Sequence, residues 1–162
     1  MELSMLKKHM IAVLCTGIFA GFFALSPLGA ATVSVLVMEA GPTRENQGGQ
    51  YPILWENGLL EVFFDSGHIV TNSPTLQIAE KPTVDFPPEA AREFDNAQEG
   101  GMEYFLVAIV DYARANVSLR LFSTTSPKMI HEQQYAANTF RSSTEEYEKI
   151  KKAVSAMTVY LR

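Results

Sequence analysis

The sequence predicts an α/β (α+β) fold. A mixed sheet of about five strands, including an antiparallel three-strand meander, is packed by two main helices and one weaker helix. Short apolar runs rich in β-branched residues alternate with longer amphipathic stretches, as in chains that layer helices on a sheet. Glycine, proline and asparagine separate these stretches. The 162 residues have the length of a single domain, and the hydrophobic fraction of 47% is sufficient for a core.

The first part of the expected domain alternates strands and helices. Val33–Met38 is a β-branched run typical of a strand buried on both faces, and His68–Thr71 begins a second strand. Between them, Pro52–Asp65 predicts a helix, because proline suits the first helical position and the apolar residues share one face. We expect Thr75–Val84 to be a loop with a short extended piece. Glu89–Gln98 predicts the weaker helix, since its apolar stripe is thin.

The second part contains the three-strand meander. Tyr104–Val110 is almost continuously apolar, which indicates a central strand covered on both faces. Val117–Ser123 alternates, with Ser118 and Arg120 on one side, so we expect one of its faces to be wet. Lys128–Tyr135 is amphipathic and is expected at or near an edge of the sheet.

The longest helix is predicted at Ser143–Leu161. Ser143 and Glu146 have the spacing of a capping box, in which a hydroxyl and a carboxylate satisfy each other's backbone donors. The apolar residues that recur at helical spacing are Tyr147, Ile150, Val154, Met157 and Leu161.

Residues 1–31 have the pattern of a secretory signal peptide. Lys7 and Lys8 precede an apolar run from Ile11 to Leu25. A helix breaker and small residues follow in the stretch SPLGAA, Ser26 to Ala31. The apolar run is short for a spanning helix, which needs about 20 residues.

Cleavage after Ala31 fits the small-residue preference of the peptidase best, with cleavage after Ala30 as the alternative. The mature chain is then a single α/β domain, residues 32–162, that is periplasmic or secreted and has no membrane span. Retention of the segment would tether the protein to a membrane. Cys15 is the only cysteine, and Leu14 before it is too large for a lipid-attachment box, which argues against a lipoprotein. Cleavage removes Cys15, so we expect no disulfide in the mature protein.

No pattern in the sequence predicts a chemistry, so we expect a protein that is not an enzyme and has no cofactor, metal or catalytic residues. The net charge of −5 argues against nucleic-acid binding. His68 and His131 lie on predicted strands without neighbours at metal-ligand spacing. Ser66 in DSGH lacks the Gly-x-Ser-x-Gly elbow of hydrolases and follows a helix rather than a strand.

Three further features have ordinary structural interpretations. The QGGQ stretch, Gln47 to Gln50, precedes a helix but lacks the lysine of a phosphate-binding loop. Glu145, Glu146 and Glu148 lie beside a group of lysines, as on a solvated helix face. Trp55, the sole tryptophan, is expected in the core, with an interface anchor as the alternative.

Four segments carry a resemblance to a known module: VSVLVM at 33–38, LLEVFFDSGHIVT at 59–71, YFLVAIVDYA at 104–113 and VSLRLFSTTSPKMIHE at 117–132. In order and pattern they resemble the α/β module of TolB N-terminal domains and of the periplasmic part of CsgG-type envelope proteins. The resemblance implies a non-enzymatic role in envelope assembly through protein contacts. It supplies no site residue for this chain.

We therefore expect a non-catalytic binding or accessory protein of the bacterial cell envelope that acts through protein–protein contacts. The expected contact surface is the Lys128–Tyr135 strand, to which a strand of an envelope protein partner could add. The alternative is a periplasmic hydrolase whose site is assembled from distant residues, with His68 or His131 among them.

Overall fold

The structure, a computed structural model, describes residues 29–41, 50–111, 113–136 and 143–161. One sheet holds all six strands in the order β2-β1-β4-β5-β6, and β3 follows β2 along the same side of β1. The strands are β1 (Thr32–Ala40), β2 (Ile69–Asn72), β3 (Leu76–Ile78), β4 (Tyr104–Asp111), β5 (Asn116–Ser123) and β6 (Ser126–Ala136). The helices are α2 (Gln50–Asp65), α3 (Ala91–Glu99) and α4 (Ser143–Met157), with short 3₁₀ turns η2 (Pro88–Ala90) and η3 (Thr158–Tyr160).

The topology confirms the predicted mixed sheet and its meander. β1 runs parallel to β2, β3 and β4, whereas β4, β5 and β6 pair antiparallel in chain order. The sixth strand, β3, is the short extended piece expected within Thr75–Val84. Parallel neighbours need long crossovers, and these contain α2 and α3.

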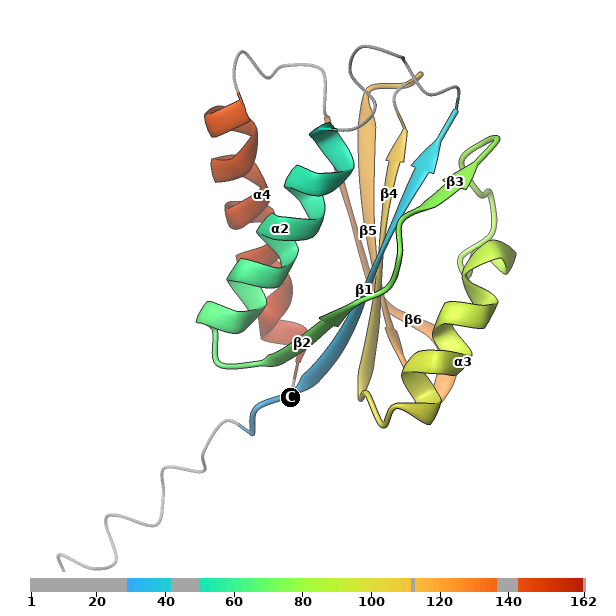
Figure 1. Cartoon of the computed structure of the whole chain (residues 1–162), viewed down its shortest axis with the longest axis vertical. Helices are drawn as coiled ribbons and strands as arrows, with labels where there is room; N and C mark the ends of the chain where they lie inside the picture. The colour runs from blue at the N-terminus through green and yellow to red at the C-terminus, as the bar shows by residue number, and fades with distance from the viewer. Residues whose placement is uncertain (1–28, 42–49, 112, 137–142, 162) are drawn as a thin grey trace, which may run out of the picture.

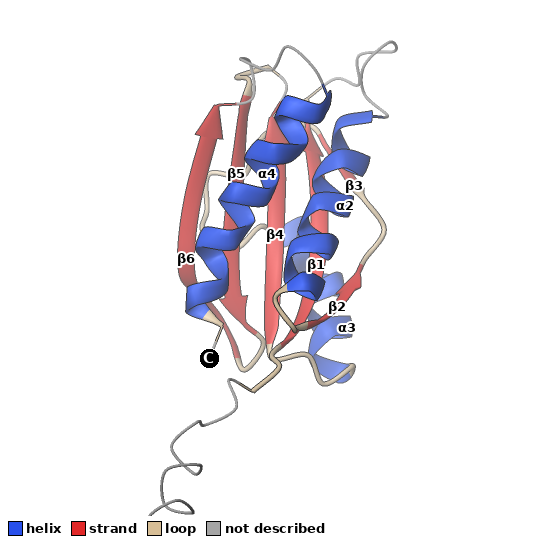
Figure 2. Cartoon of the chain, turned by 90° about the vertical axis from the view of Figure 1, so that its left-hand side faces the viewer, coloured by secondary structure: helices blue, strands red, loops and turns tan. Residues whose placement is uncertain are grey.

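The helices cover the two faces of the sheet unequally. α2 and α4 lie side by side on one face, and α3 lies alone on the other (Figures 1 and 2). β1 and β4 are buried along almost their whole length, as their continuous apolar runs predict. Under α2 and α4 the core consists mainly of Val35, Val37, Leu106, Ala108, Leu119 and Leu121, packed by Trp55, Leu59, Phe63, Ile150, Val154 and Met157.

The face that carries Ser118 and Arg120 is covered, so the expectation of a wet face on β5 is wrong. Arg120 is only 6% exposed, and its Nη1 donates to the carbonyls of Val84 at 2.7 Å and Asp85 at 3.1 Å. These bonds hold the segment between β3 and α3 over the sheet. Phe86 in that segment packs edge-on against Phe122 at 5.3 Å between ring centroids. The alternation of apolar and polar residues shows correctly which side chains share a face. It does not show exposure, because a polar side chain can be buried when backbone carbonyls accept its hydrogen bonds.

Several predictions fall on residues outside the described ranges. They are the signal peptide up to residue 28, the QGGQ stretch at residues 47–49 and the Ser143 side chain of the capping box. Ala31 is described and buried: its N–H donates to His68 Nδ1 at 3.2 Å, and its carbonyl accepts from the Ile69 N–H at 2.9 Å. Among the described residues, no helix is long and apolar enough to cross a membrane.

The contact between α2 and α4 depends on Gly58. A Cβ at this position would overlap Cγ2 of Ile150 on α4. The obstructing methyl sits on a β-branched carbon, which has little rotamer freedom in a helix. Gly58 therefore lowers the helix propensity of α2 but permits the close approach of the two helices.

We expect Gly58→Ala to destabilise the protein, although alanine is favoured over glycine in a helix by about 1 kcal/mol. Overpacking at a rigid contact costs about 1–3 kcal/mol, so after the propensity gain the net loss should be up to about 2 kcal/mol in the free energy of unfolding, measured by urea denaturation.

The matched control is the same substitution in an Ile150→Ala background, which removes the obstructing methyl. There, Gly58→Ala should become stabilising. If Gly58→Ala stabilises the otherwise unchanged protein, the close approach of α2 and α4 is contradicted.

Candidate functional site

β6 forms an edge of the sheet, as predicted for Lys128–Tyr135. It pairs with β5 along one side, and in the described part of the chain no strand pairs with its other side. An unpaired side presents backbone N–H and C=O groups on which another strand can pair.

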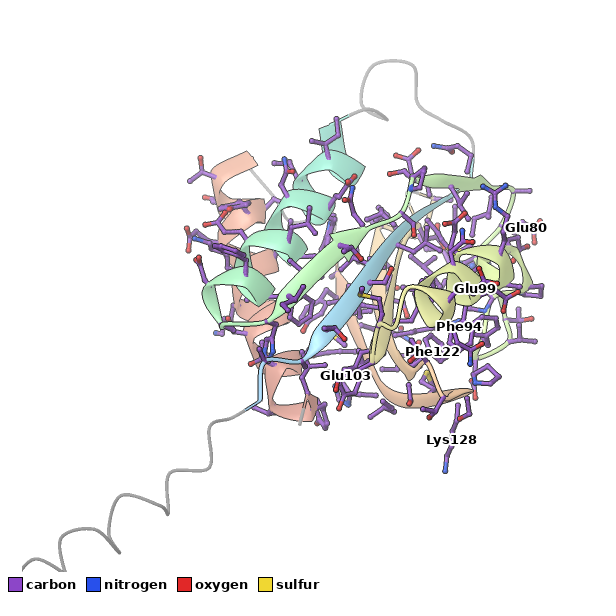
Figure 3. All side chains as sticks on the ribbon, turned by 60° about the horizontal axis from the view of Figure 1, so that its bottom comes forward. Glu80, Phe94, Glu99, Glu103, Phe122 and Lys128 are labelled. Carbon is purple, nitrogen blue, oxygen red and sulfur yellow. The ribbon has the colours of Figure 1, made fainter. Side chains whose placement is uncertain are left out.

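The two halves of β6 differ in regularity. His131–Ala136 pairs without interruption with Asn116–Leu121. Before it, the register shifts, so that Met129 and His131 have successive partners on β5 and Ile130 bulges between them. The first half also contains Pro127 and Lys128, and the Lys128 side chain extends away from the sheet (Figure 3). Proline, lysine and a bulge are the usual features that prevent an edge from pairing, so the regular stretch His131–Ala136 is the part suited to pairing.

One face of this regular stretch is tied to the interior. Glu132 Oε1 accepts hydrogen bonds from Ser118 Oγ at 2.8 Å and from Arg120 Nε at 3.0 Å. Burial alone would raise the pKa of Glu132, but these hydrogen bonds and the guanidinium charge outweigh it and hold the pKa below its ordinary value. Glu132 is thus an internal ion-pair partner of β5.

The opposite face of the stretch turns toward α4. His131 stacks on Tyr160 of η3 with ring centroids 4.0 Å apart. The Tyr135 hydroxyl donates to the Ala153 carbonyl at 3.3 Å, and its ring lies 6.3 Å from that of Trp55. Burial raises the pKa of Tyr135 to about 12. These contacts fasten the inner part of β6 beneath the helix.

A groove of about 440 Å³ remains between α4 and β6. This volume lies within the range of about 300–1,000 Å³ found for ligand sites. Trp55 of α2 contributes an aromatic wall, and the alanines of α4 leave the groove unfilled. The lining residues are Trp55, Gln133, Tyr135, Ala136, Lys149, Lys152, Ala153 and Ala156.

Buried polar atoms lie at and beside the groove. Gln133 Oε1 is buried without a hydrogen-bond partner among the described residues. Trp55 Nε1 and Glu146 Oε1 are also buried and form no hydrogen bond of good geometry, although the indole N–H lies close enough to the carboxyl to lower its pKa. Glu146 is 1% exposed, so the predicted solvated face is wrong for this residue, whereas Glu145 and Glu148 are exposed. The reason is helical spacing: Glu146 precedes the buried Ile150 by four residues and shares its face.

The environment of Glu146 favours its neutral form. Burial raises the pKa of Glu146 from 4.5 to about 7, and the indole N–H of Trp55 and the charge of Lys149 offset only part of this shift. The carboxyl therefore changes its charge near neutral pH, next to the aromatic wall of the groove.

The other candidate residues of the sequence analysis have structural roles. His68 is half-buried, accepts the Ala31 N–H, and its ring lies 6.3 Å from that of Phe63. Ser66 lies in the turn after α2, as predicted. Trp55 is 1% exposed and belongs to the core, yet it also lines the groove. Within the described ranges, no three His, Cys, Asp or Glu side chains are placed to hold a metal ion.

A smaller hollow of about 230 Å³ lies where β1 and β4 end. Ligands often bind at the carboxyl ends of parallel strands. Here Asp111 accepts the Arg114 N–H at 3.0 Å and forms an ion pair with its guanidinium at 3.2 Å. Lys81 Nζ donates to Asn116 Oδ1 at 3.1 Å. These charged groups already pair within the β4–β5 turn and with the loop after β3, so this hollow is a weaker candidate than the groove.

The raised pKa of Glu146 leads to a prediction about pH. The folded-state pKa of Glu146, about 7, lies above the ordinary 4.5. Below pH 4.5 the carboxyl is neutral in both the folded and the unfolded protein, so it costs no stability. As the pH rises from 4.5 through 7, the unfolded chain ionises first, and the free energy of unfolding falls. Glu146→Gln keeps the volume and stays neutral. We expect the variant to exceed the unsubstituted protein by about 2–3 kcal/mol in free energy of unfolding at pH 8, with little difference at pH 4.5.

Denaturant unfolding across this pH range measures the effect. The control is Glu148→Gln on the exposed side of the same helix, which should leave the difference between pH 4.5 and pH 8 unchanged. Equal pH profiles for Glu146→Gln and the unsubstituted protein would show that Glu146 ionises normally.

Comparison with solved structures finds similar folds at low identity. The chain is similar to the PelC dodecamer from Paraburkholderia phytofirmans, with 14% identity, a TM-score of 0.48, and coverage of 78% of this chain and 86% of that chain. It is also similar to the LpoB C-terminal domain from Escherichia coli, with 8% identity, a TM-score of 0.41, and coverage of 73% and 90%. At these values the likeness carries no functional conclusion, and the resemblance to TolB and CsgG stays a prediction.

Comparison of sequences finds one family model. No curated protein matches the chain. A family model described as "Uncharacterised protein" matches residues 52–150, which is more than half of the chain, and the chain therefore belongs to that family.

Proposed function

We propose that this protein is a non-catalytic binding or accessory protein of the bacterial cell envelope that acts through protein–protein contacts at β6. The observation that carries the proposal is the regular, unpaired side of His131–Ala136 within the described part of the chain. An extended segment of an envelope protein adds there as a further strand, with main-chain hydrogen bonds supplying affinity.

The surroundings of β6 support this role. Its inner contacts to Arg120, Ala153 and Tyr160 hold the strand in place, so a partner meets a preformed edge. A preformed edge lowers the conformational entropy cost of binding. The length of His131–Ala136 also matches a typical strand of about 5–6 residues.

The two histidines favour the non-catalytic interpretation over a hydrolase. His68 Nδ1 accepts a backbone N–H, and His131 is stacked on Tyr160. A general base needs a ring nitrogen within reach of a nucleophile, and neither contact supplies one.

The envelope location rests on the leader pattern in residues 1–31. N-terminal sequencing of the exported protein should find the first residue at Ala31 or Thr32. Cleavage after Ala30 would keep the hydrogen bonds of Ala31 to His68 and Ile69, whereas cleavage after Ala31 would remove them. Recovery of the chain with residue 1 intact would support the membrane-tethered alternative instead.

The edge can be tested with a photo-cross-linking amino acid in cells. Placed at the exposed Ala136 on β6, it should capture a discrete envelope partner, identified by mass spectrometry. Placed at Arg92 on α3, whose side chain is 86% exposed, it should not. Equal capture from both positions, or none from Ala136, would contradict strand addition.

Proline substitution tests the main-chain contacts. Successive N–H groups of an edge strand point alternately toward the neighbouring strand and away from it. Of Gln133→Pro and Gln134→Pro, one should therefore lower the unfolding temperature, and the other should preserve it but reduce capture from Ala136 about tenfold or more. Gln133→Ala and Gln134→Ala keep the N–H, so the loss of capture caused by proline is measured against the alanine variant at the same position. Undiminished capture by the proline variant that stays folded would exclude this edge as the contact.

A further inference from the structure

The groove and the pairing edge share the same part of β6. Gln133, Tyr135 and Ala136 line the groove and belong to the regular stretch His131–Ala136. A strand added to β6 would continue the sheet, and its side chains would alternate between the two faces. Every second side chain would project on the side of α4, where the groove lies.

The walls of the groove suit an aromatic side chain. Trp55 and Tyr135 present rings that are tilted by 40° to each other, and Ala153 and Ala156 leave space opposite them. Aromatic rings prefer edge-to-face and offset contacts with other rings. Gln133 Oε1 is buried there without a partner among the described residues, which adds an acceptor for a hydroxyl such as that of tyrosine.

Two lysines lie on the rim of the groove. Lys149 and Lys152 lie three residues apart on α4, so they are neighbours on its surface, and both are exposed. This contrasts with the net charge of −5 for the chain. An acidic side chain two positions from the aromatic residue of an added strand would project on the same face, toward these lysines.

We propose that the segment adding along β6 carries one aromatic side chain that fills the groove beside Trp55, with an acidic residue two positions away that pairs with Lys152. The partner is thus an extended polypeptide with the pattern aromatic-x-acidic or its reverse. This inference rests on the proposed function and specifies the segment that the edge recognises.

The experiment is a selection of random dodecapeptides displayed on phage against the full protein. We expect enrichment of the aromatic-x-acidic pattern. A synthetic peptide of an enriched sequence without tryptophan is then titrated. Because Trp55 is the only tryptophan of the chain, its fluorescence reports occupancy of the groove, and anisotropy of a dye on the peptide reports binding anywhere.

Two substitutions test the groove itself. Ala156→Phe fills it from an exposed position of α4, and we expect affinity for the peptide to fall about tenfold or more. The matched control is Ser155→Phe, which adds the same ring at the neighbouring exposed position outside the groove and should bind normally. Lys152→Glu should weaken binding several-fold, and more at low ionic strength because the interaction is charge-dependent.

The outcomes separate this inference from the proposed function. One outcome keeps strand addition and overturns the aromatic anchor. In it, the folded β6 proline variant no longer binds the peptide, the peptide does not change Trp55 fluorescence, and Ala156→Phe binds the peptide normally. A selection that enriches no peptide contradicts both. Enrichment of aromatic peptides without acidic residues, together with unchanged binding by Lys152→Glu, removes the charge requirement and overturns the pattern as proposed.

Discussion

The close approach of α2 and α4 at Gly58 is the contact on which the arrangement of this domain depends. α2 is anchored on β1 and β2, whereas α4 packs chiefly against α2. The space left by Gly58 accepts Ile150, and this fixes where α4 lies over β5 and β6. The surface ion pair between Lys151 and Glu61, at 2.9 Å, crosses the same interface but contributes little because both groups are solvated. The width of the groove therefore follows from the fit of a methyl group against a glycine.

The other face of the sheet is closed by a different means. α3 has only nine residues and a thin apolar stripe, so it packs over the part of the sheet near Phe105, and the segment that precedes α3 covers β5. Arg120 on β5 holds that segment in place: it donates to the carbonyls of Val84 and Asp85 and to the Glu132 carboxylate. Burying a guanidinium is costly unless its donors are satisfied, and here three of its partners are acceptors. Since Glu132 belongs to β6, the same arginine also holds the edge strand in register.

Elements buried on both faces were the ones best predicted from sequence. Val33–Met38 and Tyr104–Val110 lie in strands β1 and β4 because continuous apolar runs have few other solutions in a small domain. Arg120 and Glu146 were misjudged, since a sequence pattern records the polarity of a side chain but not the segment that covers it. The groove could not be predicted at all, because its walls come from α2, β6 and α4, and their spacing is a tertiary property. The open edge was predicted, as it depends on strand order alone.

The charge around the groove distinguishes between two kinds of occupant for the edge. A second copy pairing antiparallel through β6 would be related by a two-fold axis and would bring the two α4 helices toward each other. Lys149 and Lys152 of one copy would then approach those of the other, and like charges across such a contact are unfavourable. An acidic segment of a different protein meets the same lysines with favourable charge. The first half of β6, with Pro127, Lys128 and the bulge at Ile130, also limits how far two identical edges could align. Under the proposed strand addition, a short strand of another protein is a better occupant than a second copy, because it can match both the length of the regular stretch and the charge beside it.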